Sequence, residues 1–400
     1  GNINTSALVS NQGNTSLSAN NDINISGNIE NNDNLTLSAM GSINVSAPID
    51  GQQTGSPFTA TAGDSINISN YIITDDGVIN LTATGGAVTV ASGYGIYAGT
   101  APVSITQHDT MIVDYPFATT GNLSLNSTAA SINILNGIAG DIGNLTLVAF
   151  EDINILAPIL SHKSGTSITA TAGNDINVNA QIEGRGGVMG GTLTMTSSAD
   201  ININSDIVTN NGVINLVAGG TVSQLADGTD VYGRPLTKQI RSGNETINIQ
   251  TTDDYSPGSL VTTGNLNLLT AGNLLIDKAP IYEITGDTTL LVGGSVEIDE
   301  LVSNTTNGSD LLISAGDSIT INPGIDVGPW DGISGGSSVS LTPGGGITLV
   351  SGNDININED LVSLDGPISL YAGTTTSKTA NCTSMTCLIN LFPGKQVRAG

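Results

Sequence analysis

The sequence predicts an all-β protein whose strands coil into a right-handed parallel β-helix, or β-solenoid. A short phrase of alternating apolar and polar residues recurs about every 20–25 residues along the 400-residue chain. Glycine is abundant, with 51 residues, while aromatic residues make up only 3% of the chain. No segment shows helical periodicity. Because one unit of two or three short strands cannot bury its own apolar face, the units are expected to stack on a continuous core.

The clearest repeated phrase is Asp-Ile-Asn-Ile and its variants, bounded by Gly-Asp, Asn-Asp, Gly-Gly and Asn-Gly pairs that favour tight turns. Alternation at period two places isoleucine inside and asparagine outside. The outer asparagines either hydrogen-bond from coil to coil or only solvate the surface. The expected inward positions are Ile23, Ile43, Ile66, Ile132, Ile153, Ile176 and Ile201, and the outward positions are Asn24, Asn44, Asn67, Asn133, Asn154, Asn177 and Asn202.

The repeat predicts one solenoid domain over residues 1–373 and a cysteine-containing tail over 374–400. Roughly 15 coils are expected, stacked at about 4.8 Å, the spacing between neighbouring strands. The repeated phrase is interrupted at about 91–118, 224–258 and 326–337, where we expect excursions from the coil.

The pattern Leu-Thr-Leu-x-Ala-Gly-x-Asp-Ile-x-Ile, clearest at 34–49, 144–159 and 167–182, resembles the repeats of filamentous haemagglutinin-type exoproteins. These belong to two-partner secretion systems and include the high-molecular-weight adhesins. The resemblance implies an extracellular rod at the surface of a Gram-negative bacterium, exported by an outer-membrane transporter. The Asn-Pro-Asn motifs of the family's secretion module are missing, so we expect that module to be absent or removed.

The charge balance excludes several classes of protein. Nine Lys and Arg oppose 35 Asp and Glu, giving a net charge of −26, and no basic residue precedes Lys163. Nucleic-acid binding requires basic residues to neutralise phosphates, and docking on anionic lipid requires them too. The chain contains no run of 18 apolar residues, the length that would predict insertion into a membrane. We expect no cofactor and no metal site, since the two histidines lie far apart in the sequence.

Function in a solenoid usually lies on segments that depart from the repeat, because the rod is a scaffold. Exposed aromatic side chains there would stack on a sugar ring or anchor a protein. The alternative is that these segments only cap or cover the rod. The candidate partner-binding residues are Tyr94, Tyr97 and Tyr115 in the first interruption, Tyr232, Arg234, Lys238 and Arg241 in the second, and Trp330 in the third.

Two further features concern modification. Asn-x-Ser/Thr sequons are numerous, and the resemblance implies glycosylation, although asparagine and threonine are also ordinary surface residues of the repeat. Cys382 and Cys387 permit a small disulfide loop, which would suit an oxidising compartment. By resemblance the cysteine pair would help to anchor the protein on the cell; otherwise it pins the tail. The candidate glycosylation sites are Asn24, Asn34, Asn44, Asn67, Asn80, Asn122, Asn144 and Asn244.

These observations favour a non-catalytic adhesin or structural rod that attaches to a glycan or protein on a host or neighbouring cell. The first alternative is an extracellular filament or biofilm-matrix subunit that stacks end to end on copies of itself. A polysaccharide-acting enzyme is less favoured, because its candidate residues lie on one loop rather than on successive coils. Ice binding would need threonine arrays on consecutive coils, which most coils lack. The candidate enzyme residues are Asp227, Asp230, Arg234, Lys238 and Arg241.

Overall fold

The computed structural model describes residues 1–400 except 7–8, 12, 32, 52, 162, 164, 185–190, 230–234, 278–280, 300–301, 308–309, 323–340, 345–346, 358–360, 363–367, 373–374, 379–381, 384–386, 392–395 and 400. The chain divides into two compact units, Gly1–Ser197 and Ser198–Gly400. Every element named in the described residues is a β-strand, which confirms the all-β prediction. Among these residues no helix is long and apolar enough to cross a membrane.

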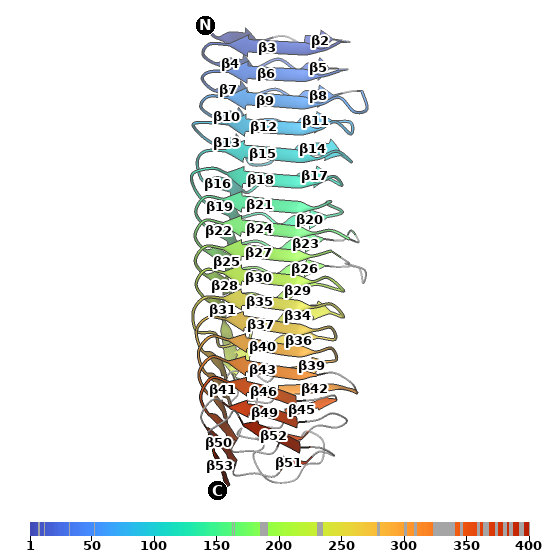
Figure 1. The fold of residues 1–400 in the computed structure, drawn as a ribbon. Helices are drawn as coiled ribbons and strands as arrows, with labels where there is room; N and C mark the ends of the chain where they lie inside the picture. Colours follow the sequence, from blue (N-terminus) through green and yellow to red (C-terminus); the bar gives the residue numbers. More distant parts are fainter. Residues whose placement is uncertain are drawn as a thin grey trace. The chain divides into compact units, whose positions relative to one another are not determined.

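In unit 1 each coil contributes a five-residue strand to one long parallel sheet, in which every strand pairs with the equivalent strand of the next coil (Figure 1). We call this sheet the long-strand face. Its strands are β3 (Thr15–Ala19), β6 (Leu35–Ala39), β9 (Phe58–Ala62), β12 (Ile79–Ala83), β15 (Val103–Gln107), β18 (Leu123–Ser127), β21 (Leu145–Ala149), β24 (Ile168–Ala172) and β27 (Leu193–Ser197).

Two shorter strands complete most coils of unit 1 and form two further faces. The second face consists of β1 (Ile3–Thr5), β4 (Ile23–Ile25), β7 (Ile43–Val45), β10 (Ile66–Ile68) and β13 (Val88–Val90), then β16 (Met111–Val113), β19 (Ile132–Ile134), β22 (Ile153–Ile155) and β25 (Ile176–Val178). The third face consists of β2 (Val9–Asn11), β5 (Ile29–Asn31), β8 (Ile49–Gly51), β11 (Ile72–Thr74), β14 (Ile96–Gly99) and β17 (Phe117–Thr119), then β20 (Ile138–Gly140), β23 (Ile159–Ser161) and β26 (Ile182–Gly184).

Unit 2 has the same construction. Its long strands are β30 (Ile214–Ala218), β35 (Ile247–Thr251), β37 (Leu266–Thr270), β40 (Thr288–Val292), β43 (Leu311–Ala315), β46 (Ile347–Ser351), β49 (Ile368–Ala372) and β52 (Cys387–Leu391). Its second face holds β28 (Ile201–Ile203), β31 (Val222–Gln224), β38 (Leu274–Ile276), β41 (Val296–Ile298), β44 (Ile319–Ile321), β47 (Ile355–Ile357), β50 (Thr375–Lys378) and β53 (Gln396–Ala399). Its third face holds β29 (Ile207–Val208), β34 (Ile240–Gly243), β36 (Leu260–Thr262), β39 (Ile281–Ile284), β42 (Val302–Asn307), β45 (Leu341–Gly344), β48 (Leu361–Val362) and β51 (Cys382–Thr383).

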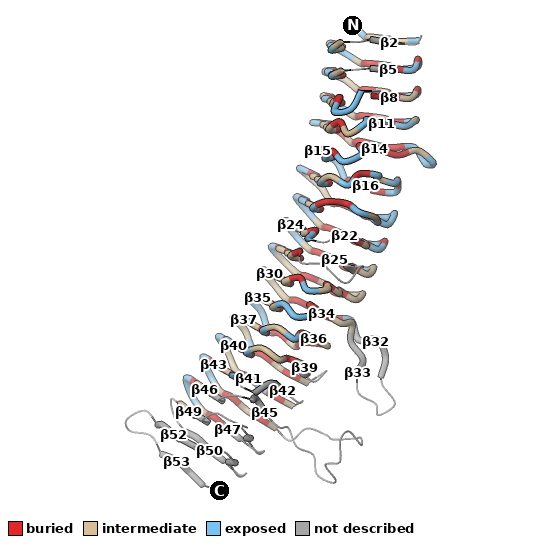
Figure 2. The backbone as a smooth tube through the Cα atoms, turned by 90° about the vertical axis from the view of Figure 1, so that its right-hand side faces the viewer, coloured by how far each residue is buried: buried red, intermediate tan, exposed pale blue. Residues whose placement is uncertain are grey.

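The core of each unit follows from the alternation in the sequence. Ile23, Ile43 and Ile66 lie opposite one another on β4, β7 and β10, and all are fully buried. Along most strands buried residues alternate with half-buried or exposed ones, as the colouring of the backbone shows (Figure 2). The predicted stack of coils on an aliphatic core, the parallel β-solenoid, is therefore confirmed.

The interruptions of the repeated phrase are less disruptive than expected. Residues 91–118 hold β14, β15 and β16, which pair in parallel with strands of neighbouring coils, so the coil continues through them. The alternation of apolar and polar residues persists there although the phrase itself is lost. Within 224–258 the departure is an antiparallel hairpin of β32 (Ala226–Thr229) and β33 (Pro235–Thr237), after which β34 and β35 resume the coil. The third interruption, 326–337, lies outside the described residues.

The backbone of the expected tail also pairs with the coils. β50 and β53 extend the second face of unit 2 beyond β47, and β52 pairs with β49 on the long-strand face. β51 pairs with β48 on the third face. Cys382 and Cys387 therefore begin strands on two different faces, and their side chains lie outside the described residues.

A candidate partner-binding surface

The third face of unit 1 presents a column of outward residues whose chemistry changes from acidic to aromatic. In register along β5, β8, β11, β14 and β17 are Glu30, Asp50, Ile73, Tyr97 and Ala118 (Figure 1). Each position is about 4.8 Å from the next, because neighbouring strands are that far apart. The same column therefore holds two carboxylates beside an apolar and an aromatic side chain.

Three tyrosines gather around this column. The ring centroid of Tyr71 lies 5.1 Å from that of Tyr94 at an interplanar angle of 74°, and 5.8 Å from that of Tyr97 at 54°. The Tyr71 hydroxyl donates to the Gly93 carbonyl oxygen over 3.1 Å, which fixes the ring at the centre of the group. Tyr71 is 36% exposed and Ile73 40% exposed. We call Tyr71, Ile73, Tyr94 and Tyr97 the tyrosine surface.

Gly95 makes this arrangement possible. A Cβ atom at Gly95 would lie 3.0 Å from the Tyr97 hydroxyl oxygen and 2.9 Å from the Pro116 carbonyl oxygen. Glycine therefore leaves room for the Tyr97 hydroxyl to lie against the backbone of residue 95, immediately before β14. The edge-on and tilted ring contacts are the geometries that aromatic pairs favour, so the three rings support one another. The result is an ordered aromatic platform rather than three separate side chains.

The amino-acid sequence indicated only part of this surface. Tyr94 and Tyr97 were expected there, but Tyr71 was missed because it belongs to a regular copy of the repeat. Tyr115 was also expected to contact a partner, and the structure corrects this. Its ring is buried against Phe117, with centroids 5.1 Å apart and only 2% of the residue exposed. Burial, with a smaller effect of the Asp114 carboxylate, raises the pKa of the Tyr115 hydroxyl above its usual range.

The basic cluster of the second interruption is only partly described. Tyr232, Arg234 and Trp330 lie outside the described residues, as does the side chain of Asp227. Lys238 is half-buried, and its carbonyl oxygen accepts from the Gln224 amide over 2.8 Å at the base of the hairpin. Arg241 is exposed on β34 between Val208 and Val261.

The outward asparagines form hydrogen-bonded ladders. In unit 1 Asn24 donates to Asn4 over 2.7 Å, Asn44 to Asn24 over 2.8 Å, and Asn67 to Asn44 over 2.8 Å, each from Nδ2 to Oδ1. A second ladder of the same unit joins Asn133, Asn154 and Asn177. Unit 2 has a ladder on its long-strand face instead, with bonds from Asn248 to Asn215 and from Asn267 to Asn248. Of the two hypotheses for the outer asparagines, the structure supports hydrogen bonding along the stack.

The candidate glycosylation sites fall into two structural groups. The first group lies within a ladder and is half-buried, and its members donate from Nδ2, the atom that a sugar would modify: Asn24, Asn44 and Asn67.

The second group lies immediately before a long strand. Here the asparagine side chain is exposed, and its Oδ1 atom accepts a hydrogen bond from a main-chain N–H of the next coil. Asn122 accepts from Asn144 over 2.9 Å, and Asn144 from Ser167 over 3.0 Å. Asn34 and Asn244 are also exposed, whereas Asn80 is half-buried on β12.

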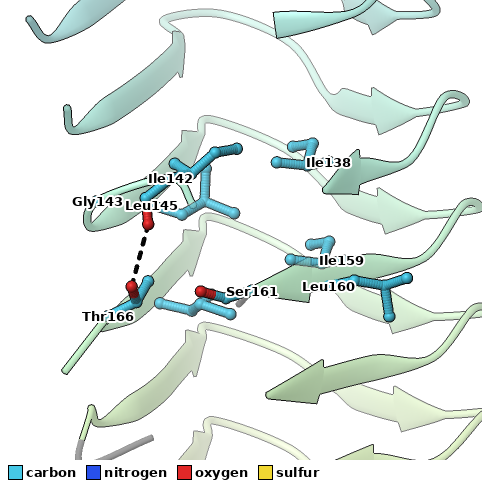
Figure 3. A pocket seen from close by; sticks show the side chains of 9 residues that line it. Ile138, Ile142, Gly143, Leu145, Ile159, Leu160, Ser161 and Thr166 are labelled. Carbon is cyan, nitrogen blue, oxygen red and sulfur yellow. Dashed lines mark hydrogen bonds between the residues drawn. The ribbon is translucent and has the colours of Figure 1, made fainter. Parts of the chain in front are cut away.

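A small cavity lies between successive coils of unit 1 (Figure 3). Its volume is about 10 Å³, which is about the least that can hold one water molecule. Ile138, Ile159 and Ser161 line it, and Thr166 donates to the Ile142 carbonyl oxygen over 3.0 Å at its edge. Within the described residues, the buried Ser161 hydroxyl has no hydrogen-bond partner. This cavity is too small to bind an organic substrate.

Within the described residues, no group of three or more His, Cys, Asp or Glu side chains is placed to hold a metal ion. Scans against protein-family models, curated proteins and solved structures found no match to this chain. The class that fold and surface define is therefore a repetitive parallel β-solenoid with an aromatic surface on one face.

Proposed function

We propose that the protein is a non-catalytic, extracellular rod that attaches a Gram-negative bacterial cell to a glycan or protein on another cell or matrix. The observation that carries the proposal is the tyrosine surface on the third face of unit 1. Tyrosine is enriched in binding surfaces because its rigid ring contributes a large contact area and its hydroxyl hydrogen-bonds at the edge. Three of the eight tyrosines of the chain meet at this one place.

The secretion route is part of the same proposal. The repeated phrase resembles exoproteins that cross the outer membrane through a dedicated transporter, and the parallel solenoid is the fold expected of such repeats. Low charge density and hydrogen-bonded asparagine ladders suit a long, solvated surface that must persist outside the cell. The proposal includes no nucleic-acid partner and no insertion into the membrane.

The absence of catalysis is also proposed. Enzymes built on parallel β-helices need carboxylates and basic groups on successive coils of one face. The outward column of the third face supplies Glu30 and Asp50 on successive coils, but its next positions are Ile73 and Tyr97, which offer neither an acid nor a base. The column is therefore better suited to contact than to proton transfer.

Attachment of coated beads tests this function. Beads carrying the full chain are counted on cultured epithelial cells and on a lawn of Gram-negative bacteria. They are compared with beads carrying Tyr71→Ala/Tyr97→Ala, and with the matched variant Ile112→Ala/Leu135→Ala, which removes exposed apolar side chains from another part of unit 1. The proposal predicts loss of attachment in the tyrosine variant only. Equal attachment by all three proteins, or none by the unaltered chain, would contradict it.

The alternative function, end-to-end stacking into filaments, is tested on the same preparations. If stacking is the function, the sedimentation coefficient measured by sedimentation velocity should rise as the protein concentration is increased. An adhesive rod gives a constant sedimentation coefficient and attaches as described above.

A further inference from the structure

We propose that the tyrosine surface binds a positively charged partner, specifically an extended peptide segment of another protein that carries Arg or Lys side chains. This inference rests on the proposed function and names the chemistry of its ligand.

The carboxylates beside the tyrosine surface are available to a ligand. Asp50 lies next to Ile73 in the outward column, and Glu30 is the next position beyond Asp50. Neither side chain makes a hydrogen bond or an ion pair with the described residues, and both are half-buried. Two adjacent, unneutralised carboxylates on neighbouring coils repel each other, and a cation bound between or beside them relieves that repulsion.

The surroundings strengthen this preference. Residues 1–162 contain no Lys or Arg and carry twelve Asp and Glu, so the whole region attracts cations and repels anions. Lys163, the first basic residue of the chain, donates from Nζ to the Thr120 carbonyl oxygen over 2.8 Å. A sulfated or sialylated glycan would therefore meet only unfavourable charge at the tyrosine surface.

The aromatic half of the surface fits the same ligand. Arg and Lys interact favourably with the faces of tyrosine rings, and their aliphatic stems pack on apolar side chains such as Ile73. From Glu30 to Tyr97 the column spans three strand spacings, about 14 Å. An extended peptide covers that distance with about four residues, at about 3.3 Å each. One short segment can thus place a basic side chain on the carboxylates and another on the tyrosines.

Fluorescence anisotropy with defined peptides tests the inference on the full 400-residue chain. The probes are labelled Gly-Arg-Gly-Arg-Gly-Arg-Gly and two peptides in which glutamine or glutamate replaces arginine. We expect binding of the arginine peptide only. The affinity should fall as salt rises from about 0.05 to 0.5 M, because exposed charges are screened over shorter distances at high ionic strength.

Paired charge variants separate the surface from the general acidity of the chain. Glu30→Gln/Asp50→Asn should weaken binding about five- to tenfold, since an exposed ion pair contributes up to about fivefold in affinity. Asp64→Asn/Asp141→Asn removes the same charge from exposed positions in the turns after β9 and β20, and should change the affinity less than about twofold. Equal loss in the two double variants, or equal binding of the arginine and glutamine peptides, would overturn the inference.

Conservative aromatic variants complete the test. Tyr97→Phe keeps the ring and should retain binding, whereas Tyr97→Leu should lose about three- to fivefold. If Tyr71→Ala/Tyr97→Ala abolishes bead attachment while no peptide binds, the proposed attachment stands and the cationic ligand is wrong. If neither attachment nor peptide binding depends on the tyrosines, both proposals fail.

Discussion

The side-chain amide of Asn44 donates from Nδ2 to the Oδ1 atom of Asn24 over 2.8 Å, one coil away. Asn44 also accepts the equivalent bond from Asn67, so each amide both donates and accepts along the ladder. Such bonds repeat in the direction of coil stacking, parallel to the main-chain bonds of the sheet. The ladder therefore couples neighbouring coils through side chains that face solvent.

Replacing Asn44 should weaken this coupling. Asn44→Ala removes two ladder hydrogen bonds and should lower the stability of unit 1 by about 1–2 kcal/mol. The matched control is Asn80→Ala, an outward asparagine on β12 that lies between Thr59 and Ser104. It should cost less than about 0.5 kcal/mol. Urea denaturation followed by circular dichroism measures both, and similar losses in the two variants would show that the ladder contributes nothing specific.

Glycosylation should favour the exposed asparagines before the long strands over the asparagines of the ladder. A glycan on Nδ2 of Asn44 would replace one of its two N–H hydrogens and crowd the neighbouring coils of the ladder. Asn122 and Asn144 hold their Oδ1 bonds and leave the exposed amide nitrogen accessible. We expect peptide mass spectrometry of material from a glycosylating host to find sugar at Asn122 or Asn144 in preference to Asn24, Asn44 and Asn67. Full occupancy at Asn44 would contradict this expectation.

Close stacking of the coils should make certain glycines irreplaceable. A Cβ atom at Gly173 would overlap the carbonyl oxygen of Phe150 on the preceding coil, whereas a Cβ atom at Gly13 would meet nothing within 4 Å. Gly173→Ala should therefore destabilise unit 1 by about 1–3 kcal/mol, as overpacking does. Gly13→Ala should leave stability within about 0.5 kcal/mol of the unaltered chain. Thermal unfolding of the two variants checks this, and an unchanged midpoint for Gly173→Ala would contradict the coil spacing.

The buried hydroxyl of Tyr115 should make unit 1 sensitive to alkali. Burial raises the folded-state pKa above the unfolded value of about 10, so the folded protein holds this proton more strongly than the unfolded chain does. Its contribution to stability is complete below about pH 10 and is lost as the pH rises towards the folded-state value. Because the hydroxyl has no hydrogen-bond partner among the described residues, Tyr115→Phe should be as stable as the unaltered chain at neutral pH, or up to about 1 kcal/mol more stable.

The pH profile separates this explanation from general alkaline damage. Denaturation midpoints are measured for both proteins between about pH 7 and 11. The unaltered chain should lose stability more steeply than Tyr115→Phe above about pH 10. Two parallel profiles would show that ionisation of Tyr115 is not linked to unfolding.

The fold was predictable because one phrase encodes both the strand and its orientation. Ile43 points into the core and Asn44 points outward, as period-two alternation requires. Stacking of the coils then brings equivalent residues into register. The surface was harder to predict. Strict alternation through Asp114, Tyr115 and Pro116 places the Tyr115 side chain inside the coil. The prediction was wrong because residues 91–118 are rich in aromatic residues and lack the repeated Asp-Ile-Asn-Ile phrase, which suggested an exposed loop. Tyr71 was missed because it meets Tyr94 and Tyr97 only when coils stack.

Site-specific photo-crosslinking tests the central claim, that the tyrosine surface contacts the partner. Tyr97 is replaced by the photoreactive residue p-benzoylphenylalanine, and a control protein carries it at Asn80, which also points outward but from the long-strand face. Each protein is irradiated on the cells to which the coated beads attach. Our account predicts a discrete crosslinked protein from position 97 and none from position 80. Adducts from position 80 alone, or the same adducts from both positions, would contradict it.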